Sequence, residues 1–132
     1  IEVLLRKESL GATFAITQFV FDSTAYARLA DALTQRGSKL VLYPGIMPVT
    51  NYRQITRMLE LSGGVMPDKY LTQFEAHKDN PEAIRALGIE FATEICYEVV
   101  ESGAAGLQFF TLNTSTATAE VVENLSPLLT GN

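Results

Sequence analysis

Three apolar runs alternate along the chain with stretches whose apolar residues recur at helical spacing. The run at 13–21 is nearly all apolar and rich in β-branched and aromatic residues. This composition is typical of a strand that is buried on both faces, as in parallel sheets. Shorter runs at 39–43 and 106–112 predict two further strands, and the first of these two ends at Pro44-Gly45.

A predicted helix follows each strand. The helical stretches begin at residues that favour helix N-termini and end at glycines that favour helix C-termini. The predicted N-caps lie in Asp22-Ser23-Thr24, at Asn51 and, for the last helix, at Asn113 or Ser115, while Asp79-Asn80-Pro81 opens the longest helix. The predicted stops are Gly37, Gly63-Gly64 and Gly103. Pro81 takes the favoured first position of the longest helix, and a short extra helix is predicted at 67–77.

The opening residues, Ile1 to Lys7, predict the end of a helix that Gly11 terminates. A helix end followed by three strand–helix units indicates an α/β fold with parallel strands and right-handed crossovers. No linker or composition break divides residues 1–132, so they form a single segment. A closed barrel of such units needs eight strands and about 250 residues. We expect either a small three-stranded domain or part of a longer chain, and a start inside a helix favours the second.

The charge and composition of the chain exclude some classes of binding partner. The net charge is −5, with 10 Lys and Arg and no basic run, which argues against nucleic-acid binding and against attraction to an anionic membrane. No apolar run approaches the roughly 20 residues that span a bilayer. The single cysteine, Cys96, permits no disulfide within the chain, and no Cys or His cluster has metal-ligand spacing. We expect a cytoplasmic protein without a metal site, with Cys96 buried and unreactive and His77 exposed.

Candidate chemistry lies at the C-terminal ends of the strands, where parallel α/β folds bind ligands. These ends fall at 18–22, 43–51 and 111–115. Gln18 is the most informative residue there, because a buried amide in an apolar strand costs about 1–3 kcal/mol when it lacks partners. Two interpretations stay open. Neighbouring backbone groups satisfy the amide, or it presents a donor and an acceptor to a heterocyclic ligand.

Other polar residues have ordinary structural interpretations. Asn51 and Gln54 have the spacing of a capping box, and Met58, one turn further on, suits a core position. Arg6 and Lys7 sit near the end of the first predicted helix, where cations are favourable.

Four motifs occur together in the order and spacing of one known family. They are AITQFVFD at 15–22, YPGIMPV at 43–49, DNPEAIRALGIE at 79–90 and FFTLN at 109–113. On these motifs the chain resembles the methylenetetrahydrofolate reductase family over essentially all of its 132 residues. The resemblance implies a (β/α)8 TIM barrel, of which this chain supplies the C-terminal three strand–helix units.

The resemblance also implies an activity. Members of the family pass a hydride from NAD(P)H to FAD, and then from the reduced flavin to 5,10-methylenetetrahydrofolate. The product is 5-methyltetrahydrofolate, used in one-carbon and methionine metabolism. The flavin carries the difficult chemistry, and the protein supplies orientation and electrostatics. Folate is thus the implied substrate, FAD and NAD(P)H are the implied cofactors, and a homo-oligomer is the expected assembly.

Site residues carry over by matching the motifs. Gln18 matches a glutamine that hydrogen-bonds the pterin and also faces the nicotinamide, and Gln54 matches a second folate-contacting glutamine. Met58 stands where an aromatic residue packs on the aminobenzoyl ring of the substrate. Lys7 and Arg6 match basic residues near the FAD phosphates, where charge-assisted hydrogen bonds are strong.

The chain departs from the family pattern after its last strand. Thr114 stands where an arginine can help to bind folate, and Phe110 lacks the phenol of the tyrosine that is common there. Loss of a charge-assisted contact costs about 1.5–3 kcal/mol, so substrate affinity is expected to differ. No catalytic residue is assigned, because the acidic group of the family lies on strands outside this sequence.

Three functions stay open. The first is a reductase in which this segment acts only together with the rest of its barrel. The second is a non-catalytic folate-binding or interaction subunit of an assembly that contains such a reductase. The third is a small α/β domain with another ligand, which predicts a stable monomer that responds to neither flavin nor folate.

Overall fold

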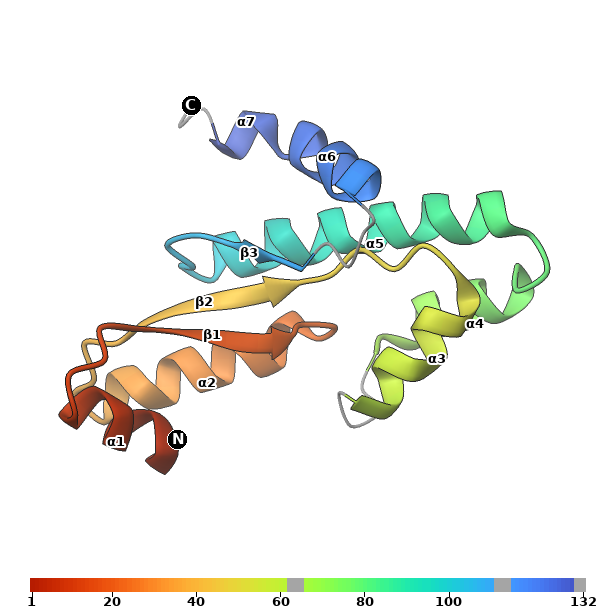
Figure 1. The fold of residues 1–132 in the computed structure, drawn as a ribbon. Coiled ribbons are helices and arrows are strands. Elements are labelled where there is room, and N and C mark those ends of the chain that lie inside the picture. The colour runs from red at the N-terminus through yellow and green to blue at the C-terminus, as the bar shows by residue number, and fades with distance from the viewer. Residues whose placement is uncertain (62–65, 111–114, 130–132) are drawn as a thin grey trace.

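The computed structural model describes residues 1–61, 66–110 and 115–129. In chain order its elements are α1 (Glu2–Ser9), β1 (Phe14–Phe19), α2 (Ser23–Gln35), β2 (Val41–Ile46), α3 (Tyr52–Leu61), α4 (Asp68–Ala76), α5 (Pro81–Glu101), β3 (Gln108–Phe109), α6 (Ser115–Asn124) and α7 (Ser126–Leu129) (Figure 1). Each predicted strand and helix has a counterpart among them, and α7 is an addition to the prediction.

The three strands form one sheet in the order β1-β2-β3, and both neighbouring pairs are parallel. Phe14 of β1 pairs with Val41 of β2, while Gly45 of β2 pairs with Gln108 of β3. The helices between the strands return the chain so that all three strands run the same way (Figure 1). The predicted α/β fold class with parallel strands is therefore confirmed.

The strand boundaries differ from the prediction. β1 is shorter than the predicted run at 13–21, and β3 occupies only the middle of the run at 106–112, whose last two residues lie outside the described chain. The end of the second strand was predicted wrongly, since β2 continues through Pro44 and Gly45 to Ile46. Proline lacks an N–H for the ladder and is normally confined to sheet edges and bulges.

A bulge lies opposite the proline in the pairing of β1 with β2. Ile16 pairs with Tyr43 and Phe19 pairs with Gly45, so two residues of β1 lie opposite Pro44 alone. One extra residue in a strand interrupts the ladder locally and lets the pairing resume beyond it. The N–H and the carbonyl of Gly45 both bond to β1, so Pro44 before it faces away from β1 and its missing N–H does not interrupt the β1–β2 ladder.

The helix boundaries follow the predicted capping chemistry. The Asp22 side chain accepts a hydrogen bond from the Thr24 backbone N–H at 2.9 Å, and Asn80 Oδ1 accepts from the Ala83 N–H at 3.2 Å. Pro81 follows Asn80 in the first helical turn, as predicted. Beyond the ends of α1, α2 and α5, the glycines at 11, 37 and 103 adopt positive φ angles of 108°, 76° and 100°, which glycine tolerates best. The predicted stop at 63–64 and the predicted cap at 113 lie outside the described residues.

The core lies between the sheet and the long helix α5. Phe91 of α5 packs against Tyr70 of α4 with 4.3 Å between ring centroids, and stacks on Phe21, just after β1, at 5.9 Å. All three side chains are buried. Helix α5 thus joins α4 and the end of β1 in one hydrophobic core.

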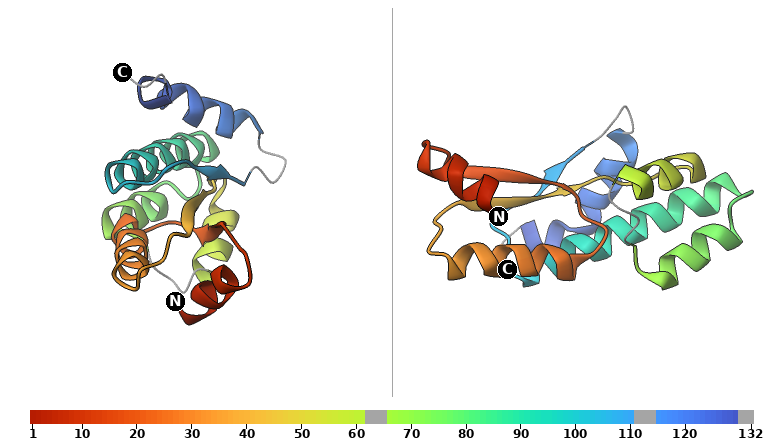
Figure 2. Two further views of the ribbon diagram at one scale, coloured as in Figure 1. Left: turned by 90° about the vertical axis from the view of Figure 1, so that its left-hand side faces the viewer. Right: turned by 90° about the horizontal axis from the view of Figure 1, so that it is seen from below.

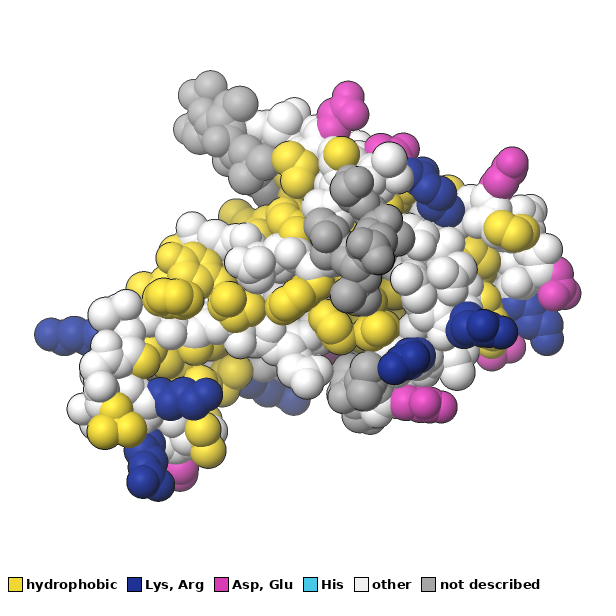
Figure 3. All heavy atoms as spheres, in the orientation of Figure 1, with side chains coloured by type: hydrophobic (Ala, Val, Ile, Leu, Met, Phe, Trp, Pro, Cys, Tyr) yellow, Lys and Arg dark blue, Asp and Glu magenta, His cyan; other side chains and the backbone are white. Residues whose placement is uncertain are grey.

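Only one face of β1 is covered by helices. α2 and α5 lie on the same side of the sheet (Figure 2), and along β1 exposed and half-buried residues alternate. Phe14 and Ile16 remain 56% and 44% exposed on the other face, where apolar side chains gather over the strands (Figure 3). The prediction that this strand is buried on both faces is wrong for the described residues, because no second helical layer lies against it there.

Candidate functional site

The C-terminal ends of the three parallel strands lie at one edge of the sheet. Helix α3 follows β2 through the loop at 47–51 and lies beyond this edge, whereas α1 precedes the first residue of β1 at the opposite end (Figure 1). Ligands of parallel α/β folds bind at the C-terminal edge. The positions of the predicted site residues relative to this edge decide which of them can act together.

Gln18 lies near the C-terminal end of β1 on the uncovered face of the sheet. It shares this face with Phe14 and Ile16, and its side chain is exposed rather than buried as predicted. It also borders an open groove of about 310 Å³ that residues 17–22 form with the start of α2. Within the described residues its amide has no hydrogen-bond partner, so both donors and the acceptor can meet a ligand.

Thr17, beside it, was missed by sequence reasoning. Its hydroxyl accepts a hydrogen bond from the Gly45 backbone N–H at 3.0 Å and donates one to the Gln18 carbonyl at 2.7 Å. The hydroxyl therefore takes a place in the ladder opposite Pro44. The available signal was a hydroxyl residue inside an apolar strand, next to Gln18.

Gln54 has the capping role that its spacing predicts. The Asn51 side chain accepts from the Gln54 backbone N–H at 2.9 Å, which places Asn51 as the N-cap of α3. The Gln54 side-chain oxygen accepts from the Thr50 N–H at 3.0 Å and from the Thr50 hydroxyl at 3.2 Å. In the usual capping box this oxygen meets the N-cap N–H instead, so the motif is shifted by one residue. The Gln54 NH2 group makes no hydrogen bond to a described residue.

Met58 belongs to the hydrophobic core, as its helical spacing suggests. It is only 6% exposed and lies on the same buried side of α3 as Ile55. A contact between its thioether and a ligand would require this side of α3 to open. Thr114 lies outside the described residues.

Arg6 and Lys7 are exposed in the last turn of α1. The structure does not bring them to Gln18, because α1 lies at the other end of β1 (Figure 1). Glu8 holds α1 in this place by accepting hydrogen bonds from the Ser38 hydroxyl at 2.6 Å and the Lys39 N–H at 2.8 Å. These two bonds lower the pKa of Glu8 below its usual range. Gln18 and α3 thus share one edge, and the two cations lie apart from it.

Two residues with reactive side chains have the structural roles predicted for them. Cys96 is fully buried in α5, and this burial raises the pKa of its thiol to about 12, which makes it unreactive. His77 is exposed at the end of α4.

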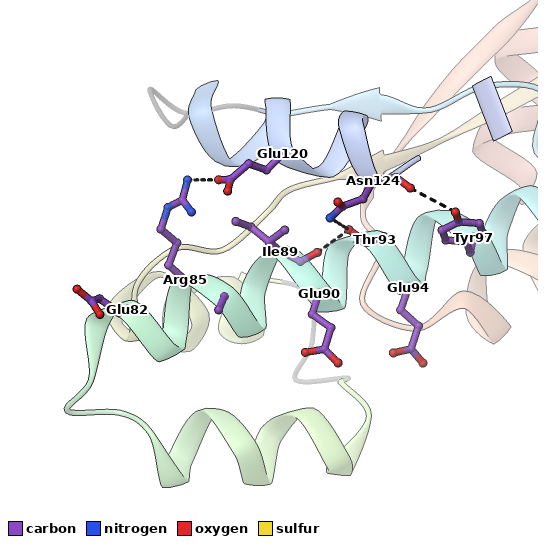
Figure 4. A pocket seen from close by; sticks show the side chains of 10 residues that line it. Glu82, Arg85, Ile89, Glu90, Thr93, Glu94, Tyr97, Glu120 and Asn124 are labelled. Carbon is purple, nitrogen blue, oxygen red and sulfur yellow. Dashed lines mark hydrogen bonds and ion pairs between the residues drawn. The ribbon is translucent and has the colours of Figure 1, made fainter. Parts of the chain in front are cut away.

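A larger hollow, of about 830 Å³, lies away from this edge between α5 and α6 (Figure 4). Arg85 forms an ion pair with Glu120 across it, and Asn124 donates from its side-chain nitrogen to the Thr93 hydroxyl at 3.3 Å. The Tyr97 hydroxyl donates to the Asn124 carbonyl at 3.3 Å. Because these polar groups bind one another, we interpret the hollow as part of the packing contact between the two helices.

Two further findings concern metals and membranes. Across residues 1–61, 66–110 and 115–129, no three side chains of His, Cys, Asp or Glu come together as a metal site. In the same part of the chain, no helix has the length and apolar character needed to cross a bilayer.

Sequence comparison places these features in a family. The family model described as methylenetetrahydrofolate reductase matches residues 1–126. The chain belongs to the methylenetetrahydrofolate reductase family. The resemblance drawn from the motifs is therefore confirmed, and three parallel strand–helix units agree with the barrel fold of the family.

Several curated members of this reductase family are similar to the chain. Methylenetetrahydrofolate reductase (NADH) 1 of Arabidopsis thaliana is 33% identical over 122 residues, which are 92% of this chain and 21% of that protein. Methylenetetrahydrofolate reductase 1 of Schizosaccharomyces pombe is 30% identical over 97% of the chain and 21% of its own length. The Escherichia coli 5,10-methylenetetrahydrofolate reductase is 31% identical over 83% of the chain and 37% of its length. The chain thus spans well under half of each of these relatives.

Proposed function

We propose that this chain forms the folate-binding edge of a methylenetetrahydrofolate reductase. In this proposal a hydride passes from NAD(P)H through FAD to 5,10-methylenetetrahydrofolate, and the segment acts as part of a barrel. Family membership and the reductase names of the similar proteins support the reaction class. The observation that carries the proposal for this chain is the exposed amide of Gln18 at the C-terminal strand edge, which has no hydrogen-bond partner among the described residues.

The amide of Gln18 suits a pterin because it offers donors and an acceptor on one planar group. A pterin presents both kinds of partner along one side of its ring, so a paired contact fixes its orientation. Oriented binding holds the reacting carbon in place for hydride transfer, which is a large part of what a protein adds to cofactor chemistry. Gln54 would add the donors of its NH2 group, which no described residue engages, since its oxygen accepts from Thr50.

The carboxylate at this edge has another task. Asp22 follows β1 directly, but its side chain accepts the Thr24 N–H and caps α2. Removal of that hydrogen bond would leave a helix terminus unsatisfied, at a cost of about 1 kcal/mol. We therefore assign Asp22 to structure and not to proton transfer.

Arg6 and Lys7 have the chemistry that FAD phosphates require. Both are exposed cations in the last turn of α1, and neither forms an ion pair with a described residue. Their N–H donors are available for charge-assisted bonds to phosphate oxygens, Arg6 in a bidentate manner. Bound FAD would supply the hydride-transfer chemistry, which no side chain provides.

Calorimetric titration of the complete gene product with 5-methyltetrahydrofolate tests the proposal. Gln18→Ala is expected to weaken binding about tenfold or more, because one or two hydrogen bonds are lost. Gln73→Ala is the matched control, since Gln73 is an exposed glutamine on α4. It should bind folate as the unchanged protein does, and equal affinities for all three proteins would contradict the proposal.

The same preparation distinguishes the proposed reductase from a folate-binding subunit. A visible flavin spectrum that NADH or NADPH bleaches supports the reductase. Folate binding without bound flavin would support the subunit instead. Neither flavin nor folate binding by the folded protein would favour an α/β domain with another ligand.

A further inference from the structure

The bulge beside Gln18 lies in the pairing of β1 with β2. Thr17 and Gln18 together face Pro44 across the β1–β2 ladder. Gly45, which follows Pro44, is oriented toward β1, so its N–H needs an acceptor on that strand at the bulge. Pairing resumes where the Val20 N–H donates to the Gly45 carbonyl at 2.9 Å.

The Thr17 hydroxyl supplies this acceptor. It accepts from the Gly45 N–H and donates to the Gln18 carbonyl, at 3.0 Å and 2.7 Å. One side chain therefore binds the backbone of both strands and occupies its own donor and an acceptor position in doing so. A buried or half-buried N–H without such a partner is unfavourable, so the Gly45 N–H depends on this hydroxyl.

The strands approach closely at this point. A Cβ placed on Gly45 would lie 2.6 Å from the Phe110 ring and 2.7 Å from the Thr17 carbonyl oxygen. Phe110 in turn packs edge-on against Phe19, with 5.3 Å between ring centroids. The backbone of β1 is thus held from two sides, by the hydroxyl contact and by an aromatic pair.

We propose that Thr17 is a positioning residue for Gln18. Its hydroxyl fixes the bulge, and the bulge sets the direction in which the Gln18 amide leaves the strand. Bulges next to functional sites commonly orient a side chain in this way. The inference rests on the proposed role of Gln18 in binding folate and adds to it the residue that orients the amide.

Two variants of the complete gene product separate the hydroxyl from the shape of the side chain. Thr17→Val keeps the β-branched shape and removes the hydroxyl, whereas Thr17→Ser keeps the hydroxyl. We expect Thr17→Val to weaken binding of 5-methyltetrahydrofolate about tenfold, the equivalent of one neutral hydrogen bond. Thr17→Ser should stay within about twofold of the unchanged protein.

A double-mutant cycle with Gln18→Ala tests positioning against mere stabilisation. If Thr17 acts through Gln18, adding Thr17→Val to Gln18→Ala should cause little further loss of folate affinity, because coupled residues are not additive. Independent effects that add would overturn the inference, as would unchanged folate binding by Thr17→Val. If Gln18→Ala alone leaves folate binding unchanged, the proposed function itself fails, whatever Thr17 does.

Hydrogen exchange gives a measurement that needs no activity. The exchange is followed by mass spectrometry on peptides that contain Gly45. The Gly45 amide should be protected from exchange in the unchanged protein and in Thr17→Ser. It should exchange about ten times faster in Thr17→Val. An unprotected Gly45 amide in the unchanged protein would overturn the inference even if Thr17→Val failed to fold.

Discussion

Gly88 of α5 lies directly against the backbone carbonyl of Val49, in the loop between β2 and α3. A Cβ on Gly88 would come within 1.7 Å of the Val49 oxygen and 2.9 Å of its carbonyl carbon. Both residues are buried. The longest helix therefore contacts the loop that carries Asn51 and leads to Gln54 of α3, and the contact leaves no space for a methyl group.

Gly88→Ala is expected to destabilise the protein despite the higher helix propensity of alanine. Propensity favours alanine by about 1 kcal/mol, but overpacking against a backbone carbonyl typically costs about 1–3 kcal/mol and sometimes more. Denaturant unfolding of the complete gene product measures the net change. Gly106→Ala is a useful comparison, since its Cβ would meet the Tyr43 ring at 3.1 Å, and a ring can shift. A Gly88→Ala protein as stable as the unchanged one would contradict the close contact.

The two roles of Gln54 can be separated by its variants. Gln54→Glu keeps the oxygen that accepts from Thr50, and a carboxylate in the first turn suits the helix dipole. Gln54→Ala removes the oxygen and should cost about 0.5–2 kcal/mol, as other cap losses do. We expect Gln54→Glu to unfold within about 0.5 kcal/mol of the unchanged protein and both variants to bind folate less tightly. Normal folate binding by Gln54→Glu would confine this residue to capping.

The contact between Tyr70 and Glu94 predicts a pH dependence of stability. The Tyr70 hydroxyl donates to the Glu94 carboxylate, and this bond, with help from Lys69, lowers the pKa of Glu94. A carboxylate with a lowered folded-state pKa stabilises the fold above its unfolded pKa, and this contribution disappears as the pH falls through the folded pKa. The loss should occur below about pH 4.5.

Unfolding midpoints between pH 3 and pH 7 test this dependence. Tyr70→Phe should lower the midpoint at neutral pH and flatten the fall on acidification. Tyr52→Phe removes a comparable hydroxyl, which donates to Glu75 at 2.8 Å on the surface, and should leave the acid limb unchanged. The prediction fails if Tyr70→Phe and the unchanged protein lose stability in parallel.

Cys96 should resist thiol reagents in the folded protein. Its thiol pKa of about 12 leaves on the order of a thousandfold less thiolate at pH 8 than an ordinary cysteine has. Labelling with iodoacetamide should therefore be slow in native protein and rapid in urea. Fast native labelling would show that α5 opens or that the core around it is loosely packed.

The parts of the fold that depend on neighbouring residues could be predicted from the sequence. Asp22, Asn80 and Pro81 begin helices where their local chemistry indicates, and the glycines after α1, α2 and α5 end helices for the same reason. Capping involves only residues a few positions apart. Such interactions are visible in the order of the residues alone.

Features that depend on a partner strand or layer were predicted less well. The bulge opposite Pro44 depends on the pairing of β1 with β2, and these two strands are distant in sequence. The exposure of Gln18 depends on which face of the sheet the helices cover. Both follow from register and layering, and the apolar run of β1 contains no sign of either.

A crystal structure of the complete gene product with bound 5-methyltetrahydrofolate would show where the pterin binds. We expect the pterin at the C-terminal strand edge, with the Gln18 amide within hydrogen-bonding distance of its ring and the Thr17 hydroxyl still bound to the Gly45 N–H. A pterin bound elsewhere, with the Gln18 amide left in solvent, would contradict this expectation.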